Sequence, residues 1–194
     1  MFKSVITIVT AAQEPMPCTV CHEGAGVLMA ALNSTKSLQY QADIVIEEGC
    51  SNWPDPNGCA LAVTAWWGRM ANVVYNSNFT TFAPSCYCNW DFIFSKNSWN
   101  CDSCQAHVKG LAEVGMSQET GIAIQEVLQG PAFCEAEDMG LSGEEVAACK
   151  QFTDGIGGAF RRIFYYVGQQ AFEICSGIVY NGICGTHRPF LGLY

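Results

Sequence analysis

The twelve cysteines of this chain fall into two sets of six that repeat the same order of short and long gaps. Each set opens with C-x-x-C, continues for roughly thirty residues to a third cysteine, crosses a short gap to the fourth and ends on a closing pair. An even number of cysteines at patterned spacings indicates a disulfide scaffold outside the cytosol, where thiols are not kept reduced. The repeat therefore predicts two similar stapled units. The first set is Cys18, Cys21, Cys50, Cys59, Cys86 and Cys88, and the second is Cys101, Cys104, Cys134, Cys149, Cys175 and Cys184.

Between the cysteines, apolar residues recur at three- and four-residue spacing, which is the period of an amphipathic helix. Val27, Leu28, Ala31 and Leu32 form such a stripe within residues 18–32, and residues 101–114 carry a matching one. The pattern predicts an all-α fold made of two bundles of four or five helices each. Further helices are expected over residues 38–46, 61–75, 122–133 and 152–174.

The last of these helices has a sequence signal for its start and one for its shape. Ser142 followed by Glu145 is the pattern of a capping box, which satisfies free backbone N–H groups at a helix start. Gly155, Gly157 and Gly158 lie inside the same segment, and each glycine costs about 1 kcal/mol relative to alanine. We expect them to loosen or bend the helix.

The domain organisation follows from the repeat. We expect a short signal segment at residues 1–12, because a basic start and a brief apolar run precede small residues there. The two helical units are expected at residues 13–88 and 101–185, joined by an aromatic-rich connector at 89–100 and followed by a tail at 186–194. No later stretch reaches the roughly 20 apolar residues that a spanning helix needs.

Charge and sequons narrow the function classes. With 18 acidic and 9 basic side chains the formal charge is −9, which disfavours nucleic acid as a partner. The sequons at Asn33 and Asn78 predict N-glycosylation and agree with the secretory route. We expect a secreted protein, or one of a lysosome-like acidic compartment.

The six-cysteine layout, read with the helices between the cysteines, resembles the saposin-like (saposin B-type) domains, in two tandem copies. The close of the second copy, from Cys175 to Gly185, is similar to the end of the saposin domain of acid sphingomyelinases. The resemblance implies six disulfides, namely Cys18–Cys88, Cys21–Cys86 and Cys50–Cys59 in the first copy and Cys101–Cys184, Cys104–Cys175 and Cys134–Cys149 in the second. Cys86 and Cys88 are only two residues apart, which suits an extended or turned segment, so the swapped pairing of Cys18 with Cys86 stays open.

Saposin-like domains bind membrane lipid on an apolar face that is exposed when their helical hairpins open, and the resemblance implies such a face in each copy. A sphingolipid is one candidate ligand. The alternative is that the same residues fill two small cores. The expected lipid-binding residues are Trp66, Trp67, Met70, Val73, Val74 and Tyr75 in the first copy and Leu128, Phe160, Ile163, Phe164, Tyr165 and Val167 in the second. The expected headgroup contacts are Arg69, Lys109, Lys150, Arg161 and Arg162, which could equally be solvated surface.

Other chemistry fits the sequence less well. Cys18 to His22 matches the C-x-x-C-H signature of c-type haem, but the second copy has no histidine at that place, so we prefer His22 as an exposed residue. A zinc site from Cys18, Cys21, Cys101 and Cys104 would leave the other cysteines unexplained. No catalytic motif accompanies the three histidines, and acidic pairs such as Glu47–Glu48 are interpreted as solvated faces. We expect no enzyme activity, no metal and no cofactor other than bound lipid.

Three functions remain as hypotheses. The first is a protein that binds or presents lipid at a membrane surface, alone or as an accessory to a lipid-degrading enzyme. The second is a secreted structural or assembly subunit that uses the bundles for contacts with a protein partner or with copies of itself. The third is a membrane-perturbing defence protein, which the acidic charge disfavours.

Acid is expected to strengthen binding to anionic vesicles, because partial protonation of the carboxylates of Glu135, Glu137 and Asp138 reduces repulsion from the lipid surface. Co-flotation with vesicles at about pH 4.5 and about pH 7.4 measures this. Equal binding at the two pH values would contradict it.

Overall fold

The computed structural model describes residues 18–77, 100–177 and 182–185, and the side chains from residue 25 onward. Residues 18–77 are called the first half below and the remaining described residues the second half. The expected signal segment, almost all of the aromatic connector, the tail, Asn78, Cys86 and Cys88 lie outside the described residues. The predicted pairings of Cys18 and Cys21 therefore lie outside them as well.

The described residues form helices and turns and contain no strand, which confirms the all-α prediction. The first half contains α1 (Cys18–Leu32), α2 (Thr35–Ile44), the π-helix η1 (Val45–Gly49), the 3-10 helix η2 (Cys50–Asn52) and α3 (Pro56–Asn76). The second half contains α6 (Cys101–Met116), α7 (Gln118–Gln129), the 3-10 helix η3 (Glu137–Met139), α8 (Gly143–Gln169) and α9 (Ala171–Ser176).

Short polar residues start the long helices by accepting hydrogen bonds from otherwise unpaired backbone N–H groups. The side chain of Asp55 accepts from the Gly58 N–H at the start of α3 (3.0 Å), where Pro56 fits the first helical position. Asn100 and Ser103 form a capping box at the start of α6. The predicted capping box of Ser142 and Glu145 is present at the start of α8.

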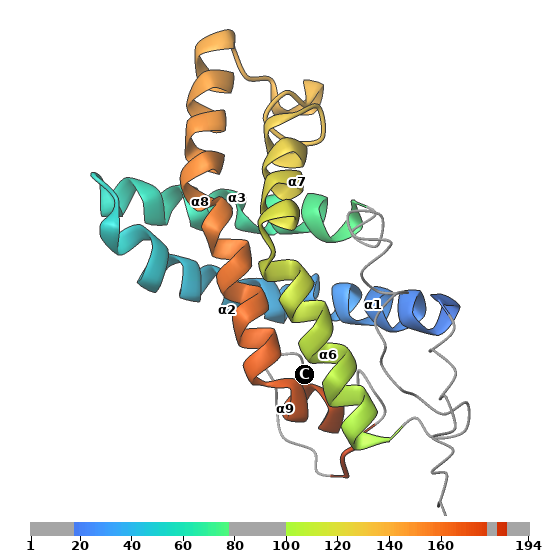
Figure 1. Ribbon diagram of the computed structural model, residues 1–194. Coiled ribbons are helices and arrows are strands. Elements are labelled where there is room, and N and C mark those ends of the chain that lie inside the picture. Colours follow the sequence, from blue (N-terminus) through green and yellow to red (C-terminus); the bar gives the residue numbers. More distant parts are fainter. Residues whose placement is uncertain (1–17, 78–99, 178–181, 186–194) are drawn as a thin grey trace, which may run out of the picture.

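Helix α8 runs for 27 residues and stays helical through Gly155, Gly157 and Gly158. Its axis changes direction partway along its length (Figure 1). The glycines therefore do not interrupt the helix, and packing on both sides offsets their low helix propensity.

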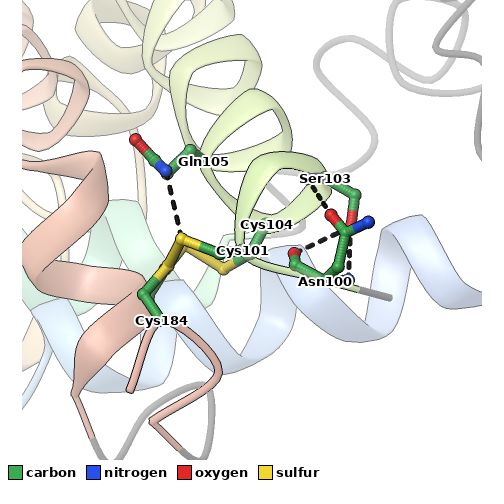
Figure 2. Close-up of a disulfide and its surroundings, with 7 residues drawn as sticks. Asn100, Cys101, Ser103, Cys104, Gln105 and Cys184 are labelled. Atoms are coloured by element: carbon green, nitrogen blue, oxygen red, sulfur yellow. Dashed lines mark hydrogen bonds between the residues drawn. A yellow bond between two sulfur atoms is a disulfide. The ribbon is translucent and has the colours of Figure 1, made fainter. Parts of the chain in front are cut away.

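Within the described residues four disulfides tie the helices together, and each joins the partners that the family resemblance implied. Cys50–Cys59 closes the turn between η2 and α3, and Cys134–Cys149 ties the segment after α7 to α8. Cys104–Cys175 and Cys101–Cys184 tie α6 to α9 and to the segment that follows it. Figure 2 shows the last of these at the start of α6, with the Gln105 amide 3.2 Å from the Cys101 sulfur.

Each half is a helical hairpin, and the two hairpins cross. In the first half α2 and α1 pack on α3, and in the second half α6 and α7 pack on α8, with α9 against α6. Figure 1 shows the helices of the first half running across the view and those of the second half running up it. The halves meet where α3 contacts α7 and where η1 contacts α8.

A single hydrophobic cluster fills both hairpins and the crossing between them. Leu28, Leu32 and Val63 belong to it in the first half, and Leu111 and Ile124 in the second, each at most 1% exposed. Two separate small cores, as the sequence repeat suggested, would have ended at the boundary between the halves. The described core instead continues across it.

Substitution of Gly115 by alanine is expected to destabilise the fold, because a Cβ there would overlap the buried ring of Phe164 where α6 and α8 pack. Overpacking of this kind costs about 1–3 kcal/mol. Gly68→Ala is the matched control, since a Cβ at that helical position meets no atom within 4 Å. Urea unfolding with the disulfides intact measures both variants. Equal stability of the two would show that Phe164 moves aside without cost.

Candidate functional site

Most of the residues expected to bind lipid are buried, and Trp67, Tyr75 and Phe160 among them meet at the boundary between the halves. Nine of the twelve are at most 5% exposed, whereas Trp66 and Tyr165 are 37% and 43% exposed and Val73 is half-buried. The buried nine are Trp67, Met70, Val74, Tyr75, Leu128, Phe160, Ile163, Phe164 and Val167. The apolar faces of the two hairpins thus cover each other in the described arrangement.

Aromatic rings hold the centre of this contact, which we call the seam. Trp67 of α3 stacks on Phe160 of α8, with ring centroids 4.8 Å apart and planes at 27°. Tyr75 meets the same phenylalanine edge-on at 6.1 Å. Such ring pairs contribute about 0.5–1.5 kcal/mol beyond the burial of their area. The seam is therefore a specific contact and not a loose apposition of apolar surface.

Two more ring pairs extend the seam toward its edges. Trp66 lies edge-on to Phe133 at 6.3 Å, and Trp53 packs against Phe152 at 5.5 Å. Trp53 also lies so close to Gly155 that a Cβ there would overlap its indole ring. The closest approach of η2 to α8 therefore requires a glycine at position 155.

In the part of the chain that the structure describes, cavities lie along the seam, and three of them can be located by the elements that line them. One of about 290 Å³ lies between η1 and α8, and one of about 220 Å³ lies between α3 and the start of α8. A third and more open hollow of about 480 Å³ lies beside Trp53 and Phe152. Close-packed interiors contain few voids of this size. The two halves therefore pack less tightly at the edges of the seam than at its aromatic centre.

Ion pairs bridge the seam at its surface. Arg162 and the hydroxyl of Tyr166, both on α8, donate to the carboxylate of Glu48 on η1. These hydrogen bonds, that of Tyr166 first, hold the pKa of Glu48 below its usual value. Arg69 of α3 donates to Asp138 of η3 at 2.6 Å. Because these groups are largely exposed to solvent, each pair adds little to stability.

The expected headgroup contacts are mostly engaged within the chain. Besides Arg69 and Arg162, Lys150 pairs with Glu135 inside the second half. Arg161 donates to the backbone carbonyl of Met116, and Lys109 is exposed on α6. Four of the five basic side chains thus already have partners in the closed arrangement.

Sequence reasoning missed the polar contacts of Glu48 and the cavity beside it. Glu47 and Glu48 are both exposed as expected, but Glu48, which lies in the π-helix, also accepts hydrogen bonds from Arg162 and Tyr166 of α8. The glycines at positions 155 and 158 lie three residues apart and so share one face of α8. That spacing was the one signal in the sequence that another element packs closely on this face of α8.

The remaining predicted positions are the sequon at Asn33 and the three histidines. Asn33 is half-buried at the turn between α1 and α2, and its side-chain oxygen is buried. His107 on α6 is 6% exposed, whereas the side chains of His22 and His187 lie outside the described residues. No helix in the described part of the chain is long and apolar enough to cross a membrane.

Comparisons with protein-family models, with curated proteins and with solved structures found no match to this chain.

The stability of the fold is expected to fall as the pH drops from about 6.5 to about 4, because burial lowers the pKa of His107 to about 4. In that window the unfolded chain binds a proton at this histidine that the folded chain does not, which favours unfolding. Between pH 7 and pH 5 this contributes about 2 kcal/mol. His107→Leu removes the titrating group. The difference in unfolding free energy between the wild type and the variant should therefore fall by about that amount from pH 7 to pH 5. Urea unfolding at the two pH values measures this difference. An advantage that is unchanged with pH would contradict this.

Proposed function

We propose that this chain is a secreted or lysosomal saposin-like protein that binds lipid, in which two tandem copies close on each other and separate to offer their apolar faces to lipid. It acts alone or as an accessory to a lipid-degrading enzyme. The observation that carries the proposal is the seam. Nine of the twelve residues expected to bind lipid are buried, and among them Trp67 and Tyr75 of the first half pack against Phe160 of the second.

The chemistry of the seam favours exchange with lipid. Burial of the apolar rings drives the halves together in water, and acyl chains offer the same rings an equally apolar surrounding. Such an exchange requires that the contact be separable. The exposed ion pairs at the rim and the cavities beside the aromatic centre support this, because they add little to the free energy of closure.

The disulfides support the family part of the proposal. All four described bridges have the partners expected for saposin-like domains, including the complete set of three in the second half. The all-helical hairpin of each half is also the arrangement that such domains adopt. The acidic charge favours an encounter with zwitterionic lipid over anionic lipid at neutral pH.

A structural or assembly subunit is the second candidate. The observation that favours it is that the seam already is an aromatic protein–protein contact, and that Leu61, Ile122 and Phe172 add exposed apolar side chains elsewhere. Native mass spectrometry of the purified protein separates the two candidates. Copurified lipid favours the first, and a stable lipid-free assembly favours the second.

Repulsion placed across the seam is expected to increase lipid binding. Asp138→Lys puts a cation opposite Arg69, where the wild type has an ion pair between the halves. Loss of the pair and the new repulsion together should shift the balance toward the open form about three- to tenfold. Flotation with neutral phosphatidylcholine vesicles at pH 7.4 should then show more bound protein.

The matched control is Glu135→Lys, which makes the same change of charge opposite Lys150 but within the second half. Quenching of tryptophan fluorescence by acrylamide reports whether the seam has opened in each variant. Equal vesicle binding by the two variants, together with increased quenching in Asp138→Lys, would mean that the open form does not bind lipid, which would contradict the proposed function.

A further inference from the structure

The cavity of about 290 Å³ between the first half and α8 is lined on two sides by different elements. Ile44 and Val45, at the junction of α2 and η1, form one side, and Ile156 and Ala159 of α8 form the other, with Trp53 beside them. Gly158 also lines it, and a Cβ at this glycine would meet no atom within 4 Å. Part of the cavity is therefore open because Gly158 has no side chain to fill it.

The same cavity has one charge of each sign at its edge. Glu48 and Arg162 both line it, and they are paired with each other. Within the described residues only Nε of the Arg162 guanidinium has a carboxylate partner, so its other N–H groups remain available to a further acceptor. The formal charge of the site is zero.

Aromatic rings lie next to these charges. The guanidinium of Arg162 is 5.8 Å from the ring centroid of Tyr165 and 5.9 Å from that of Tyr166, which is within cation–π range. Trp53 lines the cavity itself. Tyr165 and Tyr166 thus hold Arg162 and do not line the cavity, whereas a cation that binds beside Glu48 meets a carboxylate and the indole of Trp53, a combination that suits a quaternary ammonium group.

Charge complementarity selects among ligands. A lone anion that binds Arg162 leaves the site with a net negative charge in a protein whose formal charge is already −9. A lone cation that binds Glu48 meets repulsion from Arg162. A zwitterion with a phosphate and an ammonium joined by a short link places its phosphate on Arg162 and its ammonium on Glu48. The net charge of the site then stays zero.

We propose that this cavity is a binding site for the headgroup of a zwitterionic phospholipid. The phosphate binds the guanidinium of Arg162, the quaternary ammonium binds between Glu48 and Trp53, and the first methylenes of an acyl chain enter the apolar part. The choice of lipid as ligand rests on the proposed function, whereas the choice of headgroup rests on the geometry of this site. The site is present while the halves are closed, so it can recognise lipid before they separate.

The probe is dihexanoyl phosphatidylcholine below its micelle concentration, titrated into the full chain by isothermal titration calorimetry. Gly158→Leu, which fills the cavity, should weaken binding at least tenfold. Gly157→Leu is the matched control, because it makes the same change one residue away, where a Cβ meets nothing within 4 Å and does not line the cavity. Arg162→Gln should also weaken binding. Because the Arg162 side chain is exposed, this variant tests the site even if Gly158→Leu does not fold.

Two further ligands separate the contribution of the ammonium charge to binding from that of the acyl chain. Hexanoate and dihexanoyl phosphatidylglycerol, which lack the ammonium group, should bind at least tenfold more weakly than the phosphatidylcholine. Equal affinities for the three ligands, equal binding by the two leucine variants, or no binding of phosphatidylcholine by the wild type would each overturn the proposal. Vesicle flotation of Gly158→Leu distinguishes failure of the headgroup site from failure of the proposed function. If this variant still binds vesicles, the proposed lipid binding does not depend on the headgroup site.

Discussion

The rest of the structure depends on the mutual burial of two apolar hairpin faces, centred on the stack of Trp67 on Phe160. Each hairpin presents more apolar surface than its own helices can cover, and a face of that kind must find a partner in water. Here the partner is the other half of the same chain. The crossing of the hairpins, the seam cavities and the ion pairs at the rim all follow from this contact.

The helices could be predicted from sequence because their signals are local or periodic, whereas the disulfide pairings were implied by the family resemblance. The stripe after Cys104 repeats at helical spacing, and Ser142 with Glu145 marks the start of α8 within four residues. The joined core could not be predicted in the same way. The apolar pattern around Trp67 and Phe160 specifies that these faces are buried, but it does not say what covers them. A separate core for each half satisfies the same pattern.

The polar edge of the seam was beyond sequence reasoning for a different reason. Glu48 and Arg162 are 114 residues apart, and neither has a neighbour in sequence that marks it as paired. Glu48 lies in the π-helix that follows α2. The amino-acid composition of a segment does not predict such a change of helical period. Gly155 and Gly158 did carry a signal, but their effect was expected on the straightness of α8. The axis of α8 does change direction (Figure 1), and these glycines also allow Trp53 to approach and leave the cavity open.

The positions of the disulfides decide how the buried faces could become accessible. In the second half Cys104–Cys175 and Cys101–Cys184 close one end of the hairpin, and Cys134–Cys149 closes the other. A hairpin stapled at both ends cannot splay its helices far apart, because each bridge holds its Cα atoms within about 6 Å. Phe160 lies between these bridges and packs against Trp67 and Tyr75 of the first half. A ligand that reaches this face must therefore displace the first half, so the seam is the element of this fold on which access depends.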